Sequence, residues 1–172
     1  MFERLDLTPV ALLRPAPLRT PSFVADVHPG TLVRYLRLRG FDTRYDDHST
    51  DAELVHFSVA ERRILLSRDV GVLKHKVLTR AHYVRATDPG RKLEEIVRAL
   101  DLRSLIRPFT RCMRCNSHLR RVATAKVANR VPLRVRETQR RVVRCRGCGQ
   151  GYWPGSHDRQ SSALLKGNQL QS

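Results

Sequence analysis

Residues 22–40 read SFVADVHPGTLVRYLRLRG, and this stretch decides the fold. Its apolar run SFVAD predicts a strand that ends on Asp26. The following VHPG predicts a turn, and TLVRYLRLRG places Leu32 and Leu36 at helical spacing. Gly40 supplies a typical C-terminal helix stop. The stretch therefore predicts a strand, a turn and a helix in immediate succession.

The same alternation continues along the chain. FDTRYD alternates apolar and polar residues as a strand does, and Ser49 or Thr50 can cap a helix through DAELVHFSVAE. RRILLSRD then predicts a buried strand ending in Asp69, VGVLKHKV a short helix, AHYVRAT a strand and PGRKLEEIVRALDL a helix. Four such strand and helix units predict an α/β fold, with a parallel sheet flanked by helices and joined by right-handed crossovers.

Length and composition limit the remaining possibilities. The chain has 172 residues and is 41% hydrophobic, which suffices for one medium domain and a small appendage. We find no run of 18 apolar residues that could span a membrane, and no apolar signal segment, so we expect a cytoplasmic protein. The predicted division is a proline-rich arm at 1–21, the α/β domain at 22–106, a cysteine-bearing basic module at 107–160 and a polar tail at 161–172.

All four cysteines fall into two C-x-x-C pairs, Cys112 and Cys115 in CMRC and Cys145 and Cys148 in CRGC. Two such pairs supply the four thiolates of a tetrahedral zinc site, and residues 116–144 can form the hairpin that brings them together. A disulfide pair would need an oxidising compartment, and a redox centre would need only one C-x-x-C. We therefore predict a zinc ribbon with a structural zinc ion.

The net charge of +17 is concentrated in the same part of the chain. Residues 1–102 carry 17 Lys and Arg against 14 Asp and Glu, whereas residues 103–172 carry 16 against 2, giving +3 and +14. Such a surface attracts RNA by counterion release, although a basic, solvated face is the alternative. The candidate RNA-binding residues are Arg34, Arg37, Arg140, Arg141, Arg144 and Arg146, with Arg39 beside the first two.

Two aspartates, Asp26 and Asp69, each end a predicted strand, where open α/β sheets gather their ligands. Asp51 begins the helix between them and could reach the same crevice. Three carboxylates are hard oxygen ligands that suit Mg²⁺ or Mn²⁺. The alternative is that Asp26 and Asp69 only cap helices. The nearby alternatives to Asp51 are Asp46, Asp47 and Glu53, and His28 could orient a phosphate or be a solvated turn residue. Ser67 and Arg68 precede Asp69 and could position the metal or the substrate.

Five blocks in order, FVADVHPGTLVRYLRLRGFDTRYDD, DAELVHFSVAERRILLSRDVGVLK, PFTRCMRCNSHL, NRVPLRV and CRGCGQGYWPGSH, resemble the Mut-seven C-terminal RNase domain family over about residues 22–160. The resemblance implies a PIN-like sheet, a metal-dependent RNase activity and a Cys-four zinc ribbon. It places the PIN acids on Asp26, Asp69 and, less directly, Asp51, with Asp88 a loose candidate for a fourth. Pro29 departs from the leucine-like residue expected there. A proline-rich arm also stands where some relatives carry a ubiquitin-like domain.

The leading hypothesis is a ribonuclease in which Asp26, Asp51 and Asp69 hold Mg²⁺ or Mn²⁺ and the metal activates water against a phosphodiester. The basic zinc ribbon would dock the RNA. One alternative is a non-catalytic RNA-binding adaptor, which would bind RNA in a salt-sensitive way without cleaving it. Another is a toxin-like nuclease that a protein partner holds inactive.

Overall fold

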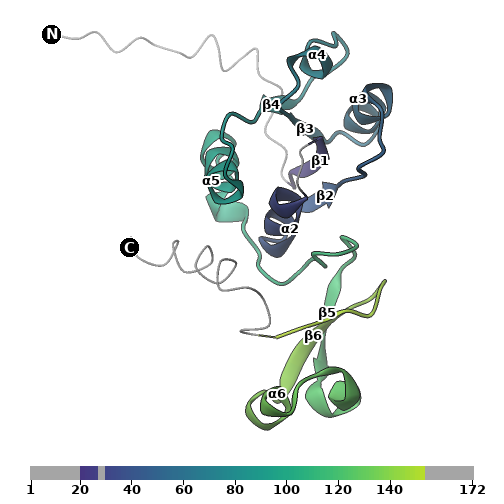
Figure 1. Cartoon of the computed structure of the whole chain (residues 1–172), viewed down its shortest axis with the longest axis vertical. Helices are drawn as coiled ribbons and strands as arrows, with labels where there is room; N and C mark the ends of the chain where they lie inside the picture. Colours follow the sequence, from purple (N-terminus) through teal and green to yellow (C-terminus); the bar gives the residue numbers. More distant parts are fainter. Residues whose placement is uncertain (1–19, 27–29, 154–172) are drawn as a thin grey trace, which may run out of the picture.

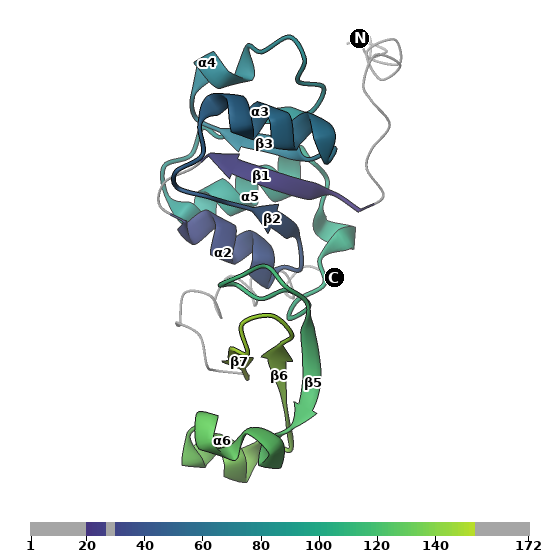
Figure 2. The same cartoon turned by 90° about the vertical axis from the view of Figure 1, so that its right-hand side faces the viewer.

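The computed structural model describes residues 20–26 and 30–153, and within them two sheets stand one beyond the other (Figures 1 and 2). The first is parallel, with strands in the order β2-β1-β3-β4. The second is antiparallel, in the order β5-β6-β7. The α/β fold with a parallel sheet is therefore confirmed. The predicted arm at 1–21, apart from its last two residues, and the predicted tail at 161–172 lie outside the described residues.

The elements of the first layer follow the predicted order. They are β1 (Ser22–Asp26), α2 (Thr31–Leu38), β2 (Asp42–Arg44), α3 (Asp51–Ala60), β3 (Ile64–Ser67), α4 (Val70–Leu73), β4 (Ala81–Tyr83) and α5 (Pro89–Ala99). Several are shorter than predicted. The strand predicted through Asp69 ends at Ser67, because Asp69 instead caps α4 by accepting a hydrogen bond from the Gly71 N–H. The helix predicted for VGVLKHKV keeps only its first four residues.

Helices cover both faces of the parallel sheet, since neighbouring residues of each strand point to opposite sides. Phe23 and Ala25 of β1 pack with α2 and α5 on one face. Val24 of β1 and Leu65 of β3 pack with α3 and α4 on the other face. Figure 1 shows α2 and α5 on one side of the strands and α3 on the opposite side. These two apolar layers fix the register of the central strands.

The second sheet contains β5 (Leu119–Ala123), β6 (Arg141–Cys145) and β7 (Gly151–Tyr152). The sequence predicted a hairpin between the cysteine pairs, and β5 and β6 form it. Two helical segments at its tip were not predicted, η2 (Thr124–Arg130) and α6 (Leu133–Thr138). Val127, Val131 and Val142 pack together and hold them against the strands. The short helix η1 (Arg103–Leu105) follows α5. The predicted domain boundaries stay a prediction.

No helix among the described residues is long and apolar enough to cross a membrane.

Candidate functional site

The four cysteines converge on one point. Their sulfur atoms all lie within 4.8 Å of one another, and two of the separations are 3.6 Å, between Cys112 and Cys148, and 3.4 Å, between Cys115 and Cys145. Four sulfurs placed tetrahedrally at about 2.3 Å from zinc are roughly 3.8 Å apart. A disulfide would need S–S contacts of about 2.05 Å, and all four thiols are free. The residues present therefore fit a zinc ion.

Each knuckle is built by backbone hydrogen bonds. In the first, the Cys112 N–H donates to the Ser117 carbonyl and the Asn116 N–H donates to the Cys112 carbonyl. Asn116 takes a φ of 66°, a left-handed conformation that asparagine tolerates better than most residues. In the second, the N–H groups of Gly147 and Cys148 donate to the Cys145 sulfur. These bonds aim both cysteines of each pair inward.

The charges of the four thiols are tightly linked. Burial acts to raise the pKa of Cys115, but hydrogen bonds to Ser117 and to the neighbouring sulfurs lower it to about 5. Burial and its bonds to the other cysteines raise the pKa of Cys148 to about 12. At neutral pH this cluster thus holds both thiolate and thiol, and a bound cation would displace the remaining protons. The Tyr152 hydroxyl lies 3.0 Å from the Cys112 sulfur and closes the buried side.

The first knuckle is attached to the parallel sheet through Arg37. This side chain is only 8% exposed. Its guanidinium donates to the Thr43 carbonyl at 2.9 and 3.0 Å, to the Met113 carbonyl at 3.1 Å and to the Arg114 carbonyl at 3.0 Å. The prediction that Arg37 contacts RNA is corrected by this geometry, because its donors are engaged inside the protein. Arg37 instead joins α2 to the cysteine knuckle.

The two predicted strand-end aspartates are joined by the serine that stands two residues before Asp69. Ser67, the last residue of β3, is fully buried and lies beside Asp26 in the register of β1 and β3. Its hydroxyl donates to Asp26 Oδ2 at 2.8 Å and accepts from the Asp69 N–H at 2.8 Å. Asp26 is half-buried and Asp69 is exposed. The serine therefore fixes the relative position of the two acids.

The strand order places this pair at a special point of the sheet. From β1 the chain crosses to β2 on one side, and it then returns to β3 on the other side of β1. In open parallel sheets, ligands bind outside the carboxyl ends of the strands where the order reverses in this way. Asp26 and Asp69 stand at the carboxyl ends of the two strands that flank the reversal. The topology thus marks them as the candidate active site.

The third acid is less well defined. Asp51 is exposed at the first residue of α3, where Thr50 and Glu53 form a capping box. In the described part of the chain, only the four cysteines bring three or more metal-ligand atoms together, so Asp26, Asp51 and Asp69 do not meet within that reach. Tyr45 points to another candidate region. Burial and the negative charges of Asp47, Asp26 and Asp46 raise its pKa.

A family model described as the Mut7-C RNAse domain matches residues 21–165. The chain belongs to the Mut7-C RNase domain family. No curated protein and no solved structure matches it. The family description names a ribonuclease domain, which gives this chain a ribonuclease-type function with RNA as the indicated substrate.

The other predicted RNA contacts of this Mut7-C domain are divided between surface and interior. Arg34, Arg140 and Arg146 are exposed. Arg144 is half-buried, and its Nε donates to the Gly149 carbonyl at 3.2 Å. Arg39 is 5% exposed. The predicted residues that lie outside the description are His28 and Pro29, together with the side chain of Arg141. Asp88 caps α5 by accepting from the Arg91 N–H at 2.9 Å.

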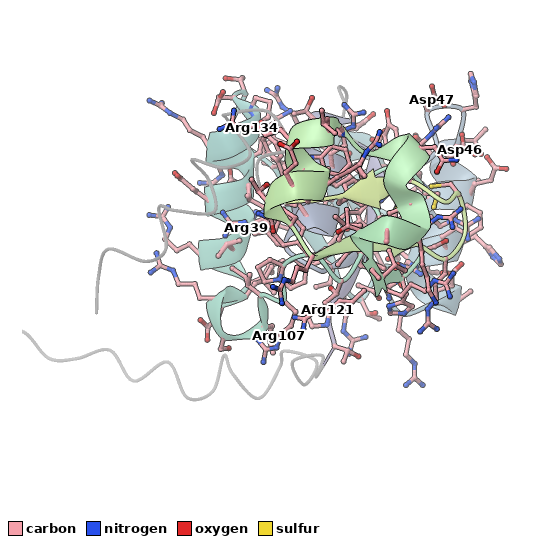
Figure 3. All side chains as sticks on the ribbon, turned by 90° about the horizontal axis from the view of Figure 1, so that it is seen from below. Arg39, Asp46, Asp47, Arg107, Arg121 and Arg134 are labelled. Atoms are coloured by element: carbon pink, nitrogen blue, oxygen red, sulfur yellow. The ribbon has the colours of Figure 1, made fainter. Side chains whose placement is uncertain are left out.

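Two polar residues that join the first knuckle to β2 were not predicted from the sequence. Asp42 and Asn116 gave no signal, because their importance arises only where the knuckle meets β2. Figure 3 shows Asp46 and Asp47 close together at the upper right of that view, with Arg107 and Arg121 in its lower part.

Proposed function

We propose that this chain is a metal-dependent ribonuclease whose catalytic centre is built on Asp26 and Asp69. The observation that supports it most strongly is the placement of both carboxylates at the strand-order reversal, joined through the buried Ser67. Two acids at the ends of adjacent parallel strands are also consistent with a PIN-like sheet. The family match supports the same class of reaction.

A hard divalent cation, Mg²⁺ or Mn²⁺, is the proposed cofactor of this centre, because carboxylate oxygens are its preferred protein ligands. Asp26 and Asp69 would hold it. The third ligand would come from Asp51 or from the loop of Asp46 and Asp47 beside Tyr45. When bound, such an ion lowers the pKa of a coordinated water and neutralises charge on the phosphodiester.

The chain itself would orient the carboxylates and supply positive charge. Ser67 donates to Asp26 and so restricts the rotation of that carboxylate. Arg68 is exposed directly before Asp69, where its guanidinium could hold an RNA phosphate. Lys92 of α5 is 2% exposed, and burial together with the charge of Arg68 lowers its pKa while Asp88 opposes the shift. The exposed Arg68 is therefore the positive charge that stands next to Asp69 in the chain.

The zinc ribbon would dock the RNA. Residues 103–172 hold +14 of the net charge of +17, and exposed arginines of this part include Arg120, Arg121, Arg140 and Arg146. Phosphate contacts of this kind give affinity without sequence preference and weaken with salt. Four free thiols assembled for zinc also favour a reducing compartment such as the cytoplasm.

The test is cleavage of a labelled single-stranded RNA by the purified chain with added Mn²⁺ or Mg²⁺. Asp26→Asn and Asp69→Asn should each reduce the rate at least about a hundredfold while leaving folding and RNA binding intact. Asp101→Asn is the matched control, since Asp101 is exposed beyond the far end of α5. Equal cleavage by all four proteins would refute the active-site assignment. Salt-sensitive binding without cleavage by any of them would favour the adaptor.

A further inference from the structure

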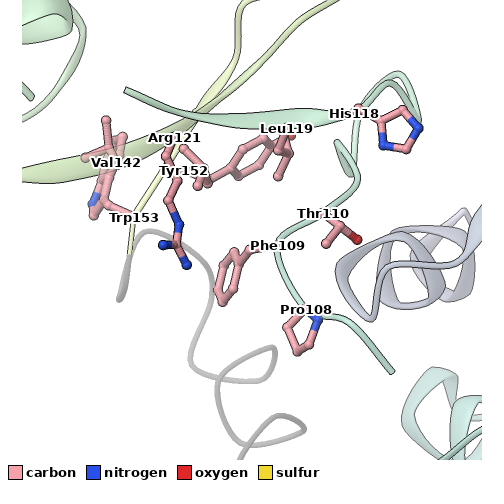
Figure 4. Close-up of a pocket in the computed structure, with 10 residues that line it drawn as sticks. Pro108, Phe109, Thr110, His118, Leu119, Arg121, Val142, Tyr152 and Trp153 are labelled. Carbon is pink, nitrogen blue, oxygen red and sulfur yellow. The ribbon is translucent and has the colours of Figure 1, made fainter. Parts of the chain in front are cut away.

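A cavity of about 510 Å³ lies where the segment before the first knuckle faces the second sheet (Figure 4). It is lined by aromatic and apolar side chains and one guanidinium. Its principal residues are Phe109, His118, Leu119, Arg121, Tyr152 and Trp153. These residues come from the 108–110 segment, from β5 and the residue before it, and from the end of β7 and the residue after it. None of them belongs to the acidic centre described above.

The backbone holds the Phe109 ring against this cavity. Phe109 takes a φ of 58°, which is unfavourable for a bulky residue. The conformation is maintained because the Phe109 N–H donates to the Leu38 carbonyl at 3.3 Å and the Arg107 N–H donates to the Arg39 carbonyl at 2.8 Å. Both bonds tie the segment to the end of α2. The ring is half-buried and is therefore not part of either apolar layer of the parallel sheet.

The opposite wall is equally well supported. Trp153 is half-buried and packs against the cluster of Val127, Val131 and Val142. Tyr152 is 3% exposed, and its hydroxyl contacts the Cys112 sulfur, so it forms the floor of the cavity. Arg121 is exposed on β5, and Figure 4 shows its guanidinium extending toward the Phe109 ring.

Aromatic rings beside an exposed arginine form the kind of site that binds single-stranded nucleic acid. Bases stack on the rings because every base has a π-face, and the guanidinium holds the phosphate or stacks in turn. The charge of the surrounding module, +14 over residues 103–172, suits a polyanion and opposes a basic or neutral peptide. The volume lies within the range of small-molecule sites.

We propose that this cavity binds one unpaired nucleobase of the RNA, stacked on Phe109 and Trp153, with Arg121 on the adjacent phosphate. The inference rests on the proposed function for the identity of the polymer. It adds a preference for single-stranded RNA, because a paired base inside a helix cannot enter the cavity. The ribbon thus selects strand state as well as supplying positive charge.

The chain offers a direct probe, because Trp153 is its single tryptophan. Uncleavable 2′-O-methyl oligoribonucleotides are titrated into the full chain at fixed salt, and Trp153 emission and binding are followed together. The three probes are a single strand, the same strand fully paired with its complement, and an abasic strand of the same charge. Only the single strand with bases should quench Trp153 strongly, since quenching requires a stacked base.

Variants of the cavity sharpen the test. Phe109→Ala and Arg121→Ala should each weaken single-strand binding by about tenfold or more, and Phe109→Ala should leave abasic-strand binding unchanged. The matched controls are Leu133→Ala and Arg134→Ala, an exposed apolar and an exposed basic residue of α6. They should keep the base-dependent binding. Thermal unfolding and zinc content confirm that each variant is folded.

The results distinguish the nucleobase site from the proposed cleavage at Asp26 and Asp69. Equal quenching by the abasic strand, or binding unaffected by Phe109→Ala, would overturn the nucleobase site even if cleavage at Asp26 and Asp69 is established. Base-dependent quenching that requires Phe109, with no cleavage under any metal, would support the site and refute the proposed catalysis. Quenching of Trp153 by the full duplex as strong as that by the single strand would also overturn the inference.

Discussion

The side chain of Asn116, next to the metal-ligand candidate Cys115, is bonded to Asp42 at the start of β2. Its Nδ2 donates to Asp42 Oδ1 at 2.8 Å, and its Oδ1 accepts from the Thr43 N–H at 3.1 Å. Arg111 adds an ion pair to Asp42 Oδ2 at 3.1 Å. The edge strand of the parallel sheet thus finds polar partners in the first cysteine knuckle. We therefore expect the folding of the knuckle to stabilise the α/β layer as well.

The first prediction concerns loss of the metal. Cys145→Ser should reduce bound zinc from one ion to about none per chain and unfold the ribbon, because structural zinc sites supply folding free energy. The coupling at Asp42 predicts that the thermal midpoint of the α/β layer falls as well. Gln150→Ser is the control, an exposed residue of the same loop. Zinc analysis and calorimetry provide the measurement, and an unchanged α/β transition would show that the layers are independent.

The second prediction concerns Arg37. Arg37→Ala removes four hydrogen bonds to backbone carbonyls in a nearly buried site and should lower the free energy of unfolding by about 3 kcal/mol. Arg37→Lys should not restore it, because one ammonium cannot replace the planar fork of the guanidinium. The exposed Arg34→Ala on the same helix should change stability by less than about 0.5 kcal/mol. Denaturant unfolding distinguishes the three, and a stable Arg37→Ala protein would contradict the assigned role.

The third prediction is a pH dependence. Burial opposes ionisation of Asp42, but hydrogen bonds from Arg63 and Asn116, with the charges of Arg63 and Arg111, outweigh it and lower its pKa below the ordinary 3.8. The unfolded chain therefore binds a proton at this residue more readily than the folded one. The stabilisation is present at neutral pH and is lost as the pH falls below about 4. Between pH 7 and pH 3 the free energy of unfolding should therefore fall by less in Asp42→Asn than in the wild type.

The fourth prediction concerns Gly40, which has a φ of 95° after α2. A Cβ at this position would lie 2.2 Å from the Arg107 carbonyl oxygen, where the chain returns from α5 to the knuckle. Gly40→Ala should therefore destabilise by about 2 kcal/mol or more through left-handed strain and the clash. Gly151→Ala is the control, since its Cβ would meet its nearest neighbour, Trp153, at an ordinary 3.7 Å. Equal melting temperatures for the two variants would contradict this account.

Short sequence patterns predicted the features that depend only on residues close together in the chain. The spacing of apolar residues in 22–40 and the cap at Thr50 specify elements on their own, and the paired cysteines specify a ligand set. The interior position of Arg37 could not be predicted, because its partners at Met113 and Arg114 lie more than 70 residues away. The helices between β5 and β6 were missed because they are short and pack mainly on valines of the ribbon.

The candidate site was predictable only as far as strand ends could be identified. Asp26 and Asp69 stand at the ends of apolar runs. They lie near each other because β1 and β3 are adjacent parallel strands that end at the same edge of the sheet. The third acid depends on how the 45–51 loop folds over the sheet, and no sequence period encodes that. The charges of Asp47, Asp26 and Asp46 all act to raise the pKa of Tyr45, an effect that no local sequence pattern encodes.

The last prediction separates positioning from stability at Ser67. Ser67→Ala removes the hydroxyl that donates to Asp26 and accepts from the Asp69 N–H, so it should slow RNA cleavage about tenfold or more while lowering stability by about 1–2 kcal/mol. Ser58→Ala is the matched control, because Ser58 is also buried and donates to the Arg63 carbonyl at 2.8 Å. It should cost similar stability and leave the cleavage rate unchanged. If both variants cleave at the wild-type rate, Ser67 contributes only to stability and Asp26 needs no such restraint. If the Mn²⁺ concentration needed for cleavage changes only in Ser67→Ala, the effect of Ser67 acts through the two acids.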